Sequence, residues 1–600
     1  MNNLPQLTDF LPTTVKEARL RGWEQVDVIL FSGDAYVDHP AFANAVIARV
    51  IESQGLTVAI VPQPNWQDDL RDFRKFGSPR LFFAVSGGNM DSMVNHYTAN
   101  RRLRSDDAYT PEGRASARPD RTTIVYCQIL KKLFPDTPIL IGGIEVSMRR
   151  FTHYDYWDNC LKQSILSESG ADLAVYGMGE KPLISIINDL KNGKKFHEIK
   201  NIPQTFYLIN TKPQNHENAI LLHSHEDCLK NKIKYAENFK IIEEESNKIN
   251  AKHILQKIGN QYIAVNPPYP PLASEELDAI YDLPFTRLPH PKYRGKTIPA
   301  YEMIKFSVNI HRGCFGGCAF CTISAHQGKF ISSRSENSIL SEIKKIVQMP
   351  DFKGYLSDLG GPSANMYQMS GKNLEICKKC KKPSCVFPKM CKNLNADLQP
   401  LINLYKKIDA MAEIKKSFIG SGVRYDMLLG EKNENHEREY LNELIINHVS
   451  GRLKVAPEHT QERVLQTMRK ANFNNFEKFK NIFDKINSQH NLNQQLIPYF
   501  ISSHPACQPE DMAELAVKTK KMNFQLEQVQ DFTPTPMTLA TEMYYTETDP
   551  YTKEKIFVAK TKEEKLAQRM FFFWYKKEYK NQIINYLRKI KRDDLIKKIF

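Results

Sequence analysis

Three cysteines in a short glycine-rich stretch constrain this chain more than any other feature. The stretch is Ser307–Arg334, and its C-x3-C-x2-C group consists of Cys314, Cys318 and Cys321. The glycines packed around these cysteines let the backbone bend tightly about a bound group without Cβ clashes. A cubane cluster bound by four thiolates is coordinatively complete, whereas one bound by three leaves an iron open for a substrate or cofactor. The pattern therefore predicts an iron–sulfur cluster with a free coordination position.

The apolar segment Met303–Ile310 directly before this stretch is predicted to be a buried strand. The cysteine loop then follows the carboxyl end of a strand, where α/β barrels place their chemistry. A zinc site or three buried thiols is the weaker alternative, because zinc prefers four ligands and the stretch supplies no fourth.

The motif HRGCFGGCAFC, with Phe320 directly before the last cysteine, resembles the signature of the radical S-adenosylmethionine (radical SAM) enzymes. This motif and the segment SRSENSILSEI narrow the resemblance to the YgiQ-type proteins of that superfamily. The similarity to these proteins extends over nearly the whole chain. The resemblance implies that Cys314, Cys318 and Cys321 hold a 4Fe–4S cluster whose free iron is chelated by SAM. It also implies that Phe320 lies against the adenine and that a flavodoxin- or ferredoxin-type protein donates electrons.

Residues 1–200 alternate between short apolar runs and helical segments, which predicts a doubly wound parallel sheet. The expected strands are 26–33, 56–61, 81–85, 138–141 and 172–176. The ligand crevice of such a sheet lies at the carboxyl ends of its strands. Arg149 and Arg150 follow the fourth strand closely, and they either line this crevice or serve ordinary packing.

This arrangement resembles the cobalamin-binding domain that precedes many radical SAM barrels, so cobalamin is a further candidate cofactor. The motif D-x-H-x-x-G, which usually carries the cobalt-ligating histidine, is absent. The chain has Asp34-Ala-Tyr-Val-Asp38-His39-Pro40 instead, and we expect His39 to be a cap or surface residue.

Residues 201–295 are predicted to be a helical insert, helical over about 232–258, followed by a proline-rich connector. Residues 296–545 repeat strand and helix units, which predicts a partial (β/α)6 barrel. Gly360 and Gly361 end its second predicted strand and match the G-G-E pattern whose backbone contacts SAM, although Pro362 replaces the acidic residue. Other polar residues at predicted strand ends could contact SAM or act on the substrate, namely Arg424, Asp426, Glu458, His459 and His504. We list Arg424 with Phe320, Gly360 and Gly361 as cofactor-binding and assign no catalytic residue.

A second cysteine group, which we call the knuckle, occupies residues 377–391. Its C-x2-C-x4-C-x5-C pattern is formed by Cys377, Cys380, Cys385 and Cys391 among several lysines. Four thiolates in so short and charged a segment predict a second metal, and either zinc or an Fe–S cluster satisfies them. Disulfide pairing is the alternative that a reducing compartment disfavours.

Charge and hydropathy bear on the possible partners and on the location of the protein. The net charge is +15, and residues 551–600 contain 15 Lys and Arg against 6 Asp and Glu. This basic tail, 546–600, is predicted to be helical, with an apolar stripe that includes Leu566, Ile583 and Leu587. No apolar run approaches the roughly 20 residues needed to span a bilayer, so we expect no membrane segment. Eleven cysteines in 600 residues are too sparse for a disulfide scaffold, and their clustering indicates metal binding in a reducing cytoplasm.

The leading hypothesis is therefore a radical SAM enzyme that abstracts hydrogen from an unknown substrate, with RNA or protein among the candidates. The alternative is a non-catalytic nucleic-acid-binding protein with structural Fe–S and zinc sites, because the tail is basic.

Overall fold

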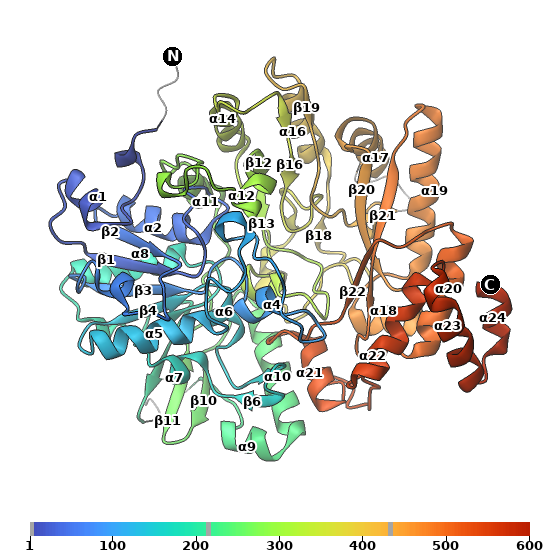
Figure 1. Cartoon of the computed structure of the whole chain (residues 1–600), viewed down its shortest axis with the longest axis horizontal. Helices are drawn as coiled ribbons and strands as arrows, with labels where there is room; N and C mark the ends of the chain where they lie inside the picture. The colour runs from blue at the N-terminus through green and yellow to red at the C-terminus, as the bar shows by residue number, and fades with distance from the viewer. Residues whose placement is uncertain (1–4, 212–217, 430–435) are drawn as a thin grey trace.

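A computed structural model describes residues 5–211, 218–429 and 436–600. Two α/β parts lie side by side (Figure 1), one formed by the N-terminal half and the other by the C-terminal half of the chain.

The first part is built on the predicted parallel strands. They are β1 (Val28–Ser32), β2 (Val58–Pro62), β3 (Phe82–Ser86), β4 (Ile139–Gly142) and β7 (Leu173–Val175). Helices follow several of these strands, among them α2 (Ala43–Ser53), α5 (Thr122–Leu133) and α8 (Glu180–Lys191). Apolar side chains fill both faces of the sheet, which explains why the strands read as continuous hydrophobic runs.

The sheet continues past residue 200, and this corrects the predicted helical insert at 201–295. The added strands are β8 (Thr205–Ile209), β9 (Ile220–Leu221), β10 (Ile254–Ile258) and β11 (Gln261–Val265). The full order is β2-β1-β3-β4-β7-β8-β11-β10-β9, and the sheet is mixed, since β8 runs antiparallel to β7 and β11. The helix expected over 232–258 ends at Ser246 (α10, Lys232–Ser246). The last part of that range is strand β10, which a turn at Gly259 and Asn260 joins to β11 in a hairpin.

The second part contains strand and helix units in the predicted order. The strands of these units are β12 (Ser307–Asn309), β15 (Tyr355–Leu356), β16 (Asp358–Gly360), β19 (Lys416–Ser417), β20 (Arg452–Glu458), β21 (Gln495–Ser502) and β22 (Gln528–Asp531). The helices that follow them include α14 (Glu336–Val347), α16 (Gln399–Asp409), α18 (Glu462–Met468), α19 (Phe473–Gln489) and α20 (Pro509–Lys521). Hydrogen bonds join the strands in three groups, β12–β16, β15–β19 and β20–β21–β22.

The strand expected over 303–310 is shorter than predicted. Pro299 starts a helix, α12 (Pro299–Ile304), in which Met303 is 73% exposed, and only β12 is extended. Proline suits the first helical turn, because its missing N–H has no partner there.

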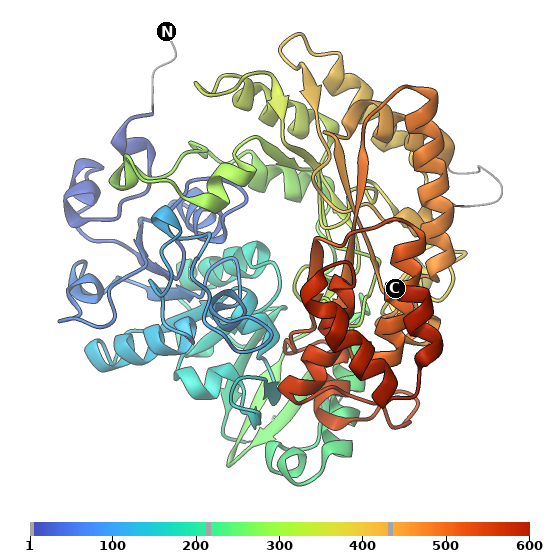
Figure 2. The same cartoon turned by 45° about the vertical axis from the view of Figure 1, so that its right-hand side comes forward.

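The tail is helical from Lys562 onward and packs against α20 (Figure 2). Its helices are α22 (Lys562–Arg569), α23 (Lys577–Lys589) and α24 (Asp593–Ile599). Residues 547–561, which were also predicted to be helical, form turns and an isolated bridge between Thr548 and Lys555. Ile583 and Leu587 are buried, but Leu566 is 45% exposed, so the predicted stripe was wrong there. A short 3-10 turn at Met570–Phe573 shifts the helical register. Among the described residues, no helix combines the length and the apolar character needed to cross a membrane.

Candidate functional site

The cysteine loop lies where the two parts of the molecule meet. The two ends of the loop are joined by a short antiparallel ladder between β13 (His311–Arg312) and β14 (Ser332–Ser333). Arg312 forms a buried ion pair of 2.7 Å with Glu180 at the start of α8. On the far side of the loop, His326 Nδ1 lies 2.9 Å from Ser147 Oγ. The N-terminal sheet therefore supports a loop that belongs to the second part of the molecule.

Hydrogen-bond donors are directed at the sulfur atoms of the loop. The Cys314 Sγ atom lies 3.4 Å from the N–H of Gly316 and 3.5 Å from Ser363 Oγ. Arg424 Nη1 lies 3.5 Å from Cys318 Sγ. Burial raises the pKa of Cys321 to about 12, so a bound metal would have to displace its proton. Polar contacts of this kind at Cys314 and Cys318 are the ones that tune the sulfurs of an Fe–S cluster, so the residues present fit one.

Two glycines are required by the packing of this loop. A Cβ atom on Gly316 would lie 2.5 Å from Arg424 Nη1. At Gly313, where φ is +88°, a Cβ atom would lie 2.1 Å from the Phe330 carbonyl oxygen. The glycine-rich composition therefore allows the arginine and the returning chain to approach the cysteines.

Arg424 is held from several directions. Its Nε and Nη2 atoms donate to Asp426 at 2.9 and 2.6 Å, and its backbone N–H and carbonyl bond the Asn365 side chain. The third guanidinium nitrogen, Nη1, faces Cys318 Sγ. In this arrangement Arg424 contacts a predicted cluster ligand, while its expected contact with SAM stays a prediction.

The other predicted SAM residues surround the same loop. The Phe320 ring packs edge to face on His504, with centroids 5.9 Å apart. Gly360 pairs with Asn309 in the ladder between β12 and β16. A Cβ atom on Gly361 would lie 2.7 Å from the His311 ring, so the two glycines run directly beside the start of the loop.

Of the remaining strand-end candidates, Glu458 lies near the cysteines, and His459 packs on side chains of the second part of the molecule. Glu458 adopts φ +68° at the end of β20, its carboxylate is 3.8 Å from Lys470 Nζ, and burial raises its pKa. It lies within electrostatic range of Cys321. His459 is buried, and its Nε2 atom lies 3.5 Å from Cys507 Sγ and 3.4 Å from Met512 Sδ.

The knuckle packs on the cysteine loop, which no sequence pattern indicated. The N–H of Cys385 and the hydroxyl of Ser384 both donate to the Phe315 carbonyl, at 3.1 and 3.2 Å. At Gly317 (φ +58°) a Cβ atom would lie 2.3 Å from the Pro383 carbonyl oxygen. The two cysteine groups therefore share one contact surface.

Donors also surround the knuckle thiols. Lys329 is 1% exposed, and its Nζ atom lies 2.8 Å from the Lys382 carbonyl oxygen and 3.8 Å from Cys380 Sγ. The Asn393 side-chain amide lies 3.3 Å from Cys377 Sγ. The base of the knuckle is closed by a ladder between β17 (Ser370–Gly371) and β18 (Leu394–Asn395).

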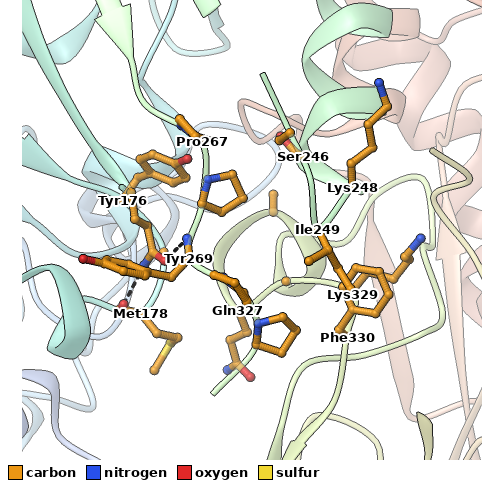
Figure 3. A pocket seen from close by; sticks show the side chains of 18 of the residues that line it. Tyr176, Met178, Ser246, Lys248, Ile249, Pro267, Tyr269, Gln327, Lys329 and Phe330 are labelled. Atoms are coloured by element: carbon orange, nitrogen blue, oxygen red, sulfur yellow. Dashed lines mark hydrogen bonds between the residues drawn. The ribbon is translucent and has the colours of Figure 1, made fainter. Parts of the chain in front are cut away.

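Two cavities flank the His326 side of the cysteine loop. The larger, of about 370 Å³, lies at the carboxyl edge of β1, β3, β4 and β7, the position predicted for a ligand crevice. The smaller, of about 140 Å³, lies between the chain after β7, the end of α10 and loop residues 324–330 (Figure 3).

His39 does not face the larger cavity as a free ligand. It is buried, which corrects the expectation of a surface residue, and its Nδ1 and Nε2 atoms contact Ala41 N–H at 3.0 Å and Arg287 Nη2 at 2.8 Å.

Known proteins match this chain over nearly its whole length. It is 63% identical to a UPF0313 protein of Bacteroides thetaiotaomicron, covering 99% of this chain and 98% of that protein. It is 61% identical to a UPF0313 protein of Porphyromonas gingivalis, covering 99% and 95%. The chain belongs to the UPF0313 family.

Two family models also match. The Radical SAM N-terminal model matches residues 10–307, and a domain of unknown function, DUF3362, matches residues 527–598. This UPF0313 protein therefore carries a radical SAM family domain, as the sequence predicted.

Among solved structures, the chain is similar to the radical SAM methyltransferase TsrM of Kitasatospora setae with cobalamin and a [4Fe-4S] cluster bound. The TM-score is 0.45 at 13% identity, covering 85% of this chain and 74% of that one. It is also similar to the cobalamin-dependent radical enzyme OxsB, with a TM-score of 0.46 at 11% identity, covering 88% and 56%.

Proposed function

We propose that this UPF0313 protein is an enzyme that cleaves SAM reductively and abstracts hydrogen from a substrate. The observation that carries the proposal is the set of donors directed at the thiols of a loop that supplies three cysteines and no fourth. Cluster sulfurs receive such contacts, and an incomplete ligand set leaves an iron for SAM.

When bound, the cluster supplies one electron that splits SAM into methionine and a 5′-deoxyadenosyl radical. Cys314, Cys318 and Cys321 would hold it, and the guanidinium of Arg424 would stabilise negative charge on Cys318. Phe320, Gly360 and Gly361 would line the SAM site. The barrel on one side and the sheet on the other would exclude water from the reacting atoms.

The test is anaerobic reconstitution with iron and sulfide, followed by SAM and a strong reductant. Mass spectrometry should detect 5′-deoxyadenosine from the native chain, and Cys318→Ala should release none. Equal release by both proteins, or no iron bound by either, would refute the proposal. No contact among the described residues favours the alternative of a nucleic-acid-binding protein without catalysis.

Cobalamin is a separate hypothesis for the larger cavity. The cavity lies at the carboxyl ends of β1, β3, β4 and β7, where a doubly wound sheet binds its ligand. Its volume of about 370 Å³ is that of a small-ligand pocket, so only part of a corrin would be enclosed. Because His39 is engaged by Arg287, a corrin would have to bind without it. Incubation with hydroxocobalamin and gel filtration would show whether the corrin absorbance stays with the protein.

We also propose that the knuckle binds a thiolate-ligated metal, zinc or an Fe–S cluster. Lys329 is a buried cation beside the thiols, and its charge would balance the negative charge of a metal–thiolate centre. Because Ser384 and Cys385 bond the Phe315 carbonyl, a metal here would also stiffen the first cysteine loop.

Metal analysis of anaerobically purified protein tests this site. Cys380→Ser and Cys391→Ser should each lose one metal centre, and the exposed Cys160→Ser, outside both cysteine groups, should lose none. Loss of zinc or loss of iron identifies the metal. Trypsin should then cleave the variants faster at Lys379 and Lys381. Unchanged metal content in both knuckle variants would refute the site.

A further inference from the structure

Arg150 is a buried cation without a counter-charge. Its residue surface is 3% exposed, and its guanidinium lies over the Tyr176 ring, 4.1 Å from the centroid. Across the described ranges of the chain, its side chain makes no hydrogen bond and no ion pair, and its Nε atom is fully enclosed without a partner. Arginine stays protonated in proteins, so this charge persists at neutral pH.

The other buried arginines of the described residues show how unusual this is. All eight form ion pairs with Asp or Glu: Arg49, Arg118, Arg149, Arg287, Arg312, Arg334, Arg424 and Arg469. The immediate neighbour Arg149 is among them, paired with Asp91. Burying an unpaired charge is strongly unfavourable, and proteins normally avoid it or satisfy it with a ligand.

Arg150 lines the smaller cavity, which is cationic. Figure 3 shows Tyr176 and Tyr269 on one side of this cavity and Lys248, Lys329 and Phe330 on the other. The charged residues of its lining are six cations and one acid, namely Arg150, Lys181, Lys248, Lys252, Arg312, Lys329 and Glu245. The acid is paired with Lys248, and Lys181 and Arg312 are paired with Glu276 and Glu180 outside the lining. Among the described residues, Arg150, Lys252 and Lys329 form no ion pair. The wall therefore offers positive charge and no free carboxylate.

The cavity has room for a small anionic group. Its volume is about 140 Å³, whereas one water occupies about 30 Å³ of the liquid. The planar fork of arginine matches the oxygens of a phosphate or carboxylate, and two tyrosine rings beside it suit the organic part of a ligand.

We infer that this cavity binds the phosphate or carboxylate group of a ligand, with the guanidinium of Arg150 as its counter-charge. The wall opposite the sheet is the cysteine loop itself. Gln327 Oε1 accepts the N–H of Gly313 at 3.2 Å, and the Gly328 carbonyl accepts the N–H of Cys314 at 3.3 Å. The anion therefore lies directly behind the backbone that carries the first cysteine.

Binding of the anion needs no cluster chemistry, so this inference and the proposed SAM cleavage can fail separately. The first experiment titrates the full chain with inorganic phosphate by calorimetry, in a buffer of constant chloride ionic strength, and repeats it with acetate. We expect saturable binding that Arg150→Met weakens about 10- to 100-fold, as loss of a charged hydrogen bond does. The tighter of the two probes identifies the anion class.

Arg80→Met is the matched control, since Arg80 lies ahead of β3 at the opposite edge of the sheet and is 64% exposed. It should bind phosphate as the native chain does. Equal phosphate affinity of the native and Arg150→Met proteins, or no binding of either probe at millimolar concentration, would overturn the inference.

A second measurement separates a ligand site from a structural role. In anion-free buffer, Arg150→Met should melt at the same or a higher temperature than the native chain, because it removes an unpaired buried charge. Phosphate should raise the melting temperature of the native chain alone. A lower melting temperature of Arg150→Met in anion-free buffer would mean that Arg150 is held by the fold and not by a ligand.

Discussion

Replacing Arg424 tests whether the charges around the cysteine loop tune a bound cluster. Arg424→Met removes a positive charge whose nearest nitrogen lies 3.5 Å from Cys318 Sγ. Two unit charges about 4 Å apart interact by about 4 kcal/mol at an effective dielectric constant near 20, which is about 170 mV for one electron. Because the added electron spreads over the cluster, we expect about half of this, a reduction potential lower by roughly 100 mV.

Asp426 makes the shift depend on pH. Burial acts to raise the pKa of Asp426, but the positive charges of Arg424 and Lys470 outweigh burial and hold the pKa below its usual value. The carboxyl group therefore stays ionised. In Arg424→Met the lowering by arginine is lost and the pKa of Asp426 rises. Protonation of Asp426 at lower pH would then cancel part of the lost charge, so the potential should be lowest at high pH.

The assay is an anaerobic redox titration followed by electron paramagnetic resonance. Asp426→Asn is the control of opposite sign, since it leaves Arg424 unpaired and should raise the potential. Iron content is measured on every sample. An unchanged or higher potential in Arg424→Met at full iron content would refute the reasoning. If Arg424→Met binds no iron, the reduction potential of Asp426→Asn is the remaining test. A potential that is unchanged or lower than that of the native chain would then refute the reasoning.

Three further perturbations follow from the same contacts. Glu342→Gln breaks a buried pair with two arginines and should lower the free energy of unfolding by about 3 kcal/mol or more in urea titrations; a change near zero would contradict the pairing. Gly317→Ala, where a Cβ would meet the Pro383 carbonyl, should reduce iron loading, whereas Gly422→Ala, with open space around it, should not. Burial acts to raise the pKa of Glu17, but its hydrogen bonds with His290 and Thr13 outweigh burial and lower the pKa from 4.5 to about 2. Its stabilisation is therefore present above pH 4.5 and lost as the pH falls toward 2, and acid denaturation of Glu17→Gln should depend less on pH in this window.

The sequence predicted the features that depend on neighbouring residues. The first five strands of the sheet are apolar runs long enough to be recognised, and α14 has a clear amphipathic pattern. The two cysteine groups are short enough for their spacing to indicate a shared ligand. The sequence did not indicate β8 to β11, because their short apolar runs lie within a polar segment rich in Asn, Lys and Glu, where a helical pattern was the stronger signal.

Only the tertiary structure decided which distant groups meet. It brings the knuckle onto Phe315 and Gly317, places Arg424 against Cys318, and packs His459 on Cys507. It also leaves Arg150 unpaired beside Arg149, although the two arginines are adjacent in the chain. The physical reason is that burial and charge pairing depend on side chains that arrive from separate strands and loops. A local sequence pattern specifies the residue type at each position but not the partner that folding places beside it.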